Sequence, residues 1–153
     1  MNTMTRLGLG PLGQLEVRPA RGDSVPTLAL PPACASGGLP LMEALLQRRS
    51  QREFATAPLP EQMLGDLLWA ACGVNRPALD GRTAPRAMNC QEIDVYVALP
   101  AGLYRYEPAG HVLCLEVPRD IRSVTGNQDF AAEAALDLVF VADNSRVQLV
   151  QGE

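Results

Sequence analysis

The stretch Arg48-Arg49-Ser50-Gln51-Arg52-Glu53-Phe54 places three arginines and a serine hydroxyl at the end of an amphipathic segment. Further along the chain, Ala84-Pro85-Arg86-Ala87-Met88-Asn89-Cys90-Gln91 reads as a loop of small residues that carries two side-chain amides. Each stretch stands between a helix pattern and the element that follows it. The order of elements around these two stretches therefore indicates the fold.

Two helices are predicted on either side of the arginine-rich stretch. Four apolar residues at helical spacing predict a helix from Pro40 to about Arg49, with the proline in its first turn and two arginines in its last turn, where cations suit the helix dipole. A second helix begins at Pro60 and ends at Gly73, a typical C-terminal cap. Trp69 is interpreted as a packing residue beside the apolar stripe of this helix, which comprises Met63, Leu64, Leu67, Leu68, Ala71 and Cys72.

The middle of the chain changes to the period of two that is typical of strands. Residues 93–99 alternate in this way, and two further strand patterns follow at 103–106 and 111–117. Since only short Pro- and Gly-containing turns separate them, the three strands are predicted to form an antiparallel meander. His111 starts the third strand without a Ser, Cys or Asp partner, so we expect it to face solvent and not to act in catalysis.

The remaining patterns complete the fold prediction. Residues 129–135 suggest a short helix, and the near-continuous apolar run 136–143 is typical of an interior strand covered on both faces. Helices and strands in this order predict an α+β fold, in which helices cover a mixed sheet with a central antiparallel meander. We assign residues 39–153 to this domain. The Gly- and Pro-rich residues 1–38, which show no sustained period, are expected to be an extended leader without an export signal.

Composition excludes several classes of function. The chain has 153 residues, of which 47% are hydrophobic and 20% charged, and a net charge of −4, which argues against a general nucleic-acid binder. No apolar run approaches the roughly 20 residues of a membrane span. Four scattered cysteines and one histidine provide no zinc set, so we predict no metal site. Thiols of this kind are expected to stay reduced in a cytoplasmic protein.

The two opening stretches carry the chemistry. Three arginines and a serine hydroxyl suit a phosphate group, because the arginine side chain offers a fixed fork of donors. Taken alone, the charge pattern of these arginines favours a solvated helix end over a phosphate site. In the later loop, small residues let backbone approach a flat ring, and Asn89 and Gln91 supply both donors and acceptors. No acid–base pair or nucleophile arrangement is found, so no catalytic side chain is predicted.

From about residue 40 to residue 143, this order of elements resembles the nitroreductase family of FMN-dependent oxidoreductases. The resemblance implies two groups of flavin contacts, supplied by different subunits of a homodimer. The first group would contact the ribityl phosphate and comprises Arg48, Arg49, Ser50 and Arg52. The second would line the flavin ring and comprises Pro85, Arg86, Ala87, Asn89 and Gln91. Arg86 stands where the family commonly has serine.

The resemblance also implies an activity. A protein of this type would pass hydride from NAD(P)H through flavin N5 to a small organic acceptor, while the protein supplies orientation and electrostatics. The alternative hypothesis, from a different functional class, is that the chain is a truncated, non-catalytic flavin-fold remnant or interaction module. The family continues with further helices beyond the strand that ends at Asp143. We therefore expect a C-terminally incomplete domain with exposed apolar surface, which would dimerise, aggregate or bind a hydrophobic dye.

Overall fold

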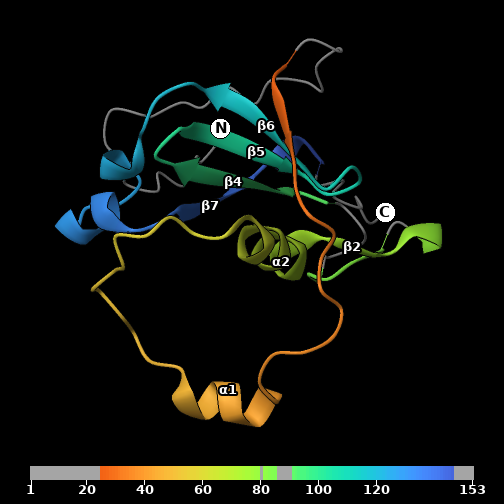
Figure 1. Ribbon diagram of the computed structural model, residues 1–153. Coiled ribbons are helices and arrows are strands. Elements are labelled where there is room, and N and C mark those ends of the chain that lie inside the picture. Colours follow the sequence, from red (N-terminus) through yellow and green to blue (C-terminus); the bar gives the residue numbers. More distant parts are fainter. Residues whose placement is uncertain (1–24, 80, 86–90, 147–153) are drawn as a thin grey trace, which may run out of the picture.

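A five-stranded sheet with one helix packed on its face forms the centre of the molecule (Figure 1). The computed structural model describes residues 25–79, 81–85 and 91–146. The strand order in the sheet is β1-β6-β5-β4-β7, and a separate two-stranded sheet pairs β2 with β3. The strands are β1 (Thr27–Ala29), β2 (Val74–Arg76), β3 (Gly81–Arg82), β4 (Ile93–Leu99), β5 (Gly102–Glu107), β6 (Val112–Val117) and β7 (Asp137–Ala142).

Two α-helices and four short 3-10 helices complete the described part of the chain. The α-helices are α1 (Leu41–Gln47) and α2 (Glu61–Cys72). The 3-10 helices are η1 (Pro77–Leu79), η3 (Arg122–Val124), η4 (Asp129–Glu133) and η5 (Asn144–Arg146). The first α-helix therefore ends two residues before the predicted Arg49, because Arg48 adopts an extended backbone (φ −60°, ψ 122°).

The predicted α+β fold and its central meander are confirmed. Strands β4, β5 and β6 follow one another in sequence and pair antiparallel, with Val97 opposite Tyr104 and Tyr106 opposite Leu113. Strands β1 and β7 also pair antiparallel with their neighbours. Every pairing among the described residues is thus antiparallel, so this part of the chain lacks the parallel pairing that the predicted mixed sheet would include.

The alternation of side chains along β4 builds two apolar clusters, one on each face of the sheet. Val95 and Val97 pack with Leu64 and Leu68 of α2 on one face. On the other face the cluster contains Tyr96, Ala98, Leu103 and Ile121. Leu68, Val97 and Leu113 are the largest fully buried side chains. The predicted stripe of α2 is buried only in part, since Met63 and Leu67 are 55% and 40% exposed.

Gly73 ends α2 for a reason other than the one predicted. Its backbone is extended (φ −70°, ψ 160°) and not left-handed, so conformational freedom is not what the position requires. A Cβ atom there would lie 2.4 Å from Cδ1 of Trp69, and no larger residue fits without displacing the indole. The half-buried Trp69 also donates from Nε1 to the carbonyl of Val74 at 3.3 Å, which fits its predicted packing role.

Strand β7 differs from the prediction of an interior strand. It pairs with β4 and stands at the edge of the sheet in the described residues. Its side chains are half-buried or exposed, and Phe140 is 53% exposed. A continuous apolar run resembles a buried strand in sequence, but pairing partners decide whether a strand lies inside a sheet or at its edge.

Part of the predicted leader belongs to the domain. Strand β1 pairs with β6, and the next residue, Leu30, is buried in the main apolar cluster. The chain then runs along α2, where Gln62 donates to the carbonyl of Pro32 at 2.9 Å and Asp66 accepts from the backbone N–H of Cys34 at 2.8 Å. The domain thus begins before residue 39. Residues 1–24 lie outside the described residues.

The sequence predicted that His111 faces solvent, but the structure places it differently. Its backbone is left-handed (φ 50°), and this turns the half-buried ring back towards the body of the domain. Nδ1 lies 2.8 Å from the hydroxyl of Tyr106, and Nε2 lies 2.9 Å from the carbonyl oxygen of Pro31. A neutral ring that carries its proton on Nε2 satisfies both contacts. His111 therefore joins the segment before α1 to the meander.

The buried hydroxyl of Tyr106 predicts a loss of stability in alkaline solution. Burial raises its pKa from 10.0 to about 12. The folded chain therefore keeps a proton that the unfolded chain loses, so the free energy of unfolding falls by up to about 2 kcal/mol as the pH rises across that interval. Urea titrations below pH 10 and near pH 12 measure this loss, and a Tyr106→Phe variant should show a smaller one. Equal losses in the two proteins would contradict the prediction.

Candidate functional site

The arginine cluster lies apart from the described members of the second predicted group within one chain. Figure 1 shows α1 set away from the sheet, and the segment that follows it returns to α2 at the end opposite β2 and β3. Arg48, Arg49, Ser50 and Arg52 are all exposed in that segment. The described members of the second group, Pro85 and Gln91, follow β3 and precede β4. A single chain therefore does not bring the arginines together with Pro85 and Gln91.

The arginine cluster carries side-chain hydrogen-bond donors that have no acceptor among the described residues. No hydrogen bond or ion pair within the described residues involves the side chains of Arg48 and Arg49. Arg52 differs, because its guanidinium carbon lies 5.9 Å from the ring centroid of Phe130. Phe54 lies against the same ring, with 6.3 Å between centroids. Arg52 and Phe54 therefore hold the end of this segment against η4.

The described members of the second group line a cavity of about 200 Å³. Pro85 is exposed at its rim and Gln91 is half-buried. Apolar residues of α2, β4 and β7 form much of the remaining wall, namely Ala71, Ile93, Val95 and Phe140. Arg86, Ala87 and Asn89 lie outside the described residues. This cavity is the place where a flat ring could lie beside the predicted loop.

Arg82 is a residue of this site that the sequence did not reveal. Its Nη1 donates to Sγ of Cys72 at 3.3 Å, and its Nη2 donates to Oε1 of Gln91 at 2.5 Å. It therefore connects the end of α2 with the first residues of β4. An arginine in a two-residue strand carries no periodic signal. Its position shortly before the Pro-containing loop was the one available indication. Because Gln91 uses its amide oxygen here, that atom is engaged within the protein.

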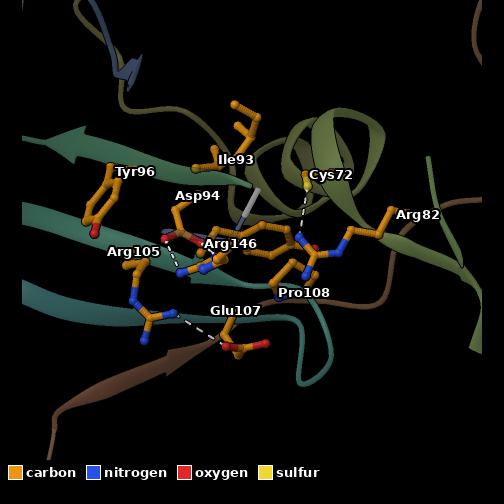
Figure 2. A pocket seen from close by; sticks show the side chains of 11 residues that line it. Cys72, Arg82, Ile93, Asp94, Tyr96, Arg105, Glu107, Pro108 and Arg146 are labelled. Atoms are coloured by element: carbon orange, nitrogen blue, oxygen red, sulfur yellow. Dashed lines mark hydrogen bonds and ion pairs between the residues drawn. The ribbon is translucent and has the colours of Figure 1, made fainter. Parts of the chain in front are cut away.

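A second cavity, of about 170 Å³, is drawn in Figure 2. It shares Cys72, Arg82, Ile93 and Val95 with the first cavity. It opens where β4 and β5 part: their pairing ends at Tyr96 and Arg105, while β4 remains paired with β7 as far as Ile93. Apart from Arg82, the charged side chains around this cavity belong to ion pairs.

These ion pairs join neighbouring elements and engage the guanidinium groups of Arg105 and Arg146. Arg146 contacts both carboxylate oxygens of Asp94, at 2.9 and 2.8 Å, and lies 3.0 Å from Asp143. Hydrogen bonding to Asp94 raises the pKa of Arg146. Arg105 lies 3.5 Å from Glu107 and 3.4 Å from Glu116. Such partly exposed pairs typically contribute below about 1 kcal/mol each, so this second cavity is interpreted as a structural one.

The described residues hold neither a metal-binding cluster nor a membrane-spanning helix. Within residues 25–79, 81–85 and 91–146, no group of three or more His, Cys, Asp or Glu side chains is arranged to hold a metal ion. In the same residues, no helix has the length and apolar character needed to cross a membrane.

The comparison with known families decides the identity of this fold. The model of the nitroreductase family matches residues 45–152, which is more than half of the chain and includes both predicted groups of site residues. The chain belongs to the nitroreductase family.

Two relatives within the nitroreductases support this assignment. A crystal structure of a protein from Ralstonia eutropha JMP134, titled provisionally as a nitroreductase, is 53% identical, with a TM-score of 0.76 over 88% of this chain and 64% of that one. A Methanocaldococcus jannaschii protein with a similarly provisional nitroreductase name is 30% identical over 123 residues, which cover 74% of this chain and 62% of the relative. This chain thus spans less than two thirds of the length of either relative.

Proposed function

We propose that this chain is an FMN-dependent oxidoreductase of nitroreductase type. The observation that carries the proposal is the family match over residues 45–152, because it covers the arginine cluster and the loop that ends at Gln91. FMN, when bound, would accept hydride from NAD(P)H at N5 and deliver the electrons to a small organic acceptor. The protein residues would bind and orient these partners.

The donors of the arginine cluster fit the phosphate end of FMN. A phosphate monoester carries about two negative charges at neutral pH, and arginine binds such groups through paired N–H donors. Arg48 and Arg49 are exposed, and no acceptor in the described residues occupies their side chains. Ser50 adds a hydroxyl, and Arg52 a third guanidinium. We propose these four residues as the phosphate and ribityl contacts.

The cavity beside β3 fits a flat ring. Apolar side chains wall it, and Pro85 and Gln91 mark the two described ends of the loop beside it. We retain Pro85, Arg86, Ala87 and Asn89 as proposed flavin contacts. For Gln91 the proposed role changes, since its amide oxygen accepts from Arg82 and holds the base of the loop.

We further propose that the working unit is a homodimer in the cytoplasm. The separation of the two groups in one chain supports a pocket that combines the arginine cluster of one subunit with the loop of the other. Helix α1 supports the same arrangement, because its apolar side chains are largely exposed and large exposed apolar surfaces favour association. These side chains are Leu41, Met42, Leu45 and Leu46, at 71%, 75%, 55% and 89% exposed.

Size-exclusion chromatography with simultaneous visible absorbance tests the proposal. We expect the protein to elute at the mass of a dimer and to carry the visible bands of oxidised flavin. Heat-released ligand should have the mass of FMN, and NAD(P)H should bleach the bands under anaerobic conditions. A colourless protein that does not acquire colour from added FMN would overturn the proposed function and favour a non-catalytic interaction module.

A further inference from the structure

Two charged side chains of opposite sign line the cavity of about 200 Å³, and each has one buried atom without a hydrogen-bond partner. The atoms are Nε of Arg82 and Oε2 of Glu92. In the part of the chain that the structure describes, these two are the only buried side-chain nitrogen or oxygen atoms in this condition. Native proteins rarely leave buried polar groups unpaired, and those that remain often serve a ligand.

Arg82 is held so that its Nε–H is the donor left without a partner. One terminal nitrogen donates to Cys72 Sγ and the other to Gln91 Oε1. These contacts fix the plane of the guanidinium from two sides. The orphaned donor therefore belongs to an anchored side chain that cannot readily turn to find an acceptor.

Glu92 is fixed by its backbone. Its carbonyl accepts from the N–H of Asp143 at 2.7 Å, at the end of β7. The carbonyl of the preceding residue, Gln91, accepts from Arg146 at 3.1 Å, and Gln91 itself has a left-handed backbone (φ 47°). The backbone of Glu92 is therefore tethered at the start of β4, and the buried Oε2 of its side chain is the second unpaired atom beside the cavity.

One donor and one acceptor beside the same small cavity define the chemistry of a complementary ligand. A simple anion would be repelled by the carboxylate and a simple cation by the guanidinium. An amide edge, –C(=O)–N–H–, offers its oxygen to Arg82 and its N–H to Glu92. Apolar walls suit a flat ring that carries this edge. The volume is below that of a typical drug-sized site, so it suits one end of a larger ligand.

We propose that Arg82 and Glu92 form a site for the amide edge of a planar heteroaromatic ring. Two ring systems share this chemistry: the imide edge of a flavin and the carboxamide of a nicotinamide. The choice of these two sources rests on the proposed function, whereas the amide chemistry rests on the cavity itself.

Matched ligand pairs test the site by calorimetric titration. Lumiflavin is compared with 3-methyllumiflavin, which lacks the imide N–H, and nicotinamide is compared with 3-acetylpyridine, which lacks the amide N–H. We expect the N–H-bearing member of one pair to bind about 10- to 100-fold more tightly, and that pair identifies the source. A Glu92→Met variant should remove the preference. Arg82→Lys should lower the affinity for both members of that pair, whereas the control Arg119→Lys, at an exposed arginine, should change neither affinity.

The melting temperature provides a second readout, because a ligand-binding role and a structural role of Glu92 predict opposite changes. Removing a carboxylate that has one buried, unpaired oxygen should raise the melting temperature of the ligand-free Glu92→Met protein, by about 2–4 °C. A structural role predicts a lower melting temperature instead. If Glu92→Met does not fold, its stabilising role is shown and the proposal fails.

Three results overturn the proposal: no binding of any probe, equal affinity within both pairs, or a preference that survives Glu92→Met. The probes lack phosphate and need no turnover. A colourless protein that still discriminates within a pair would therefore refute only the oxidoreductase, and a yellow protein without discrimination would refute only this site.

Discussion

Arg48→Ala is expected to weaken FMN binding by about 10- to 100-fold. A charge-assisted hydrogen bond to phosphate contributes roughly 1.5–3 kcal/mol, which corresponds to that range of affinity. Arg48 is exposed and has no side-chain partner among the described residues, so the substitution should affect the ligand and spare the fold. Quenching of flavin fluorescence on titration into the apoprotein measures the change.

Riboflavin is the decisive control for this prediction because it lacks the phosphate. Its affinity should be nearly the same for the wild-type chain and the variant. Arg119→Ala, at another exposed arginine, should leave both affinities unchanged. Arg52→Ala is a poorer test, since it also removes the contact with Phe130. If riboflavin lost as much affinity as FMN, Arg48 would be acting on the fold and not on the phosphate.

Leu68→Ala is expected to lower the free energy of unfolding by about 2–5 kcal/mol. Leu68 is fully buried in the cluster that joins α2 to the sheet, where it packs with Val97 and Leu113. Its truncation leaves a cavity in addition to the lost burial of apolar atoms. Since the net stability of a domain is about 5–15 kcal/mol, the loss would be a large fraction of the total.

Urea unfolding followed by circular dichroism measures this loss. Leu79→Ala is the matched control, because Leu79 is 74% exposed on η1 and its truncation should change stability by less than about 0.5 kcal/mol. A comparable effect of the two substitutions would mean that α2 does not pack on the sheet as described. That outcome would also remove the support for the position of Cys72 and Arg82 at the end of α2.

The elements that the sequence predicted well are those in which local pattern and final environment agree. The strands of the meander have regular alternation and short turns, and neighbouring residues such as Tyr96 and Val97 do enter opposite apolar clusters. Helix α2 likewise ends at Gly73 as predicted, and Leu64, Leu68 and Cys72 of its predicted stripe are buried. The family resemblance depended on the order of these elements, and the match over residues 45–152 confirms it.

The candidate site was predictable only as two separate pieces. The residue types at positions 48–52 and 85–91 indicated phosphate and ring contacts, and the structure leaves these assignments as proposals. Arg82 and Glu92 were not predicted at all. Neither belongs to a periodic pattern, and an unpaired buried atom exists only after distant elements have packed around it.

By itself, the sequence determined the fold class, the meander, the two helices and the family, because these depend on periodicity and on the order of motifs along the chain. Tertiary structure decided the rest. Pairing placed β7 at an edge of the described sheet and recruited β1 from the expected leader. Packing turned His111 towards Tyr106 and Pro31. These outcomes depend on contacts between residues far apart in sequence, such as the 80 positions between Pro31 and His111, and no local pattern encodes them.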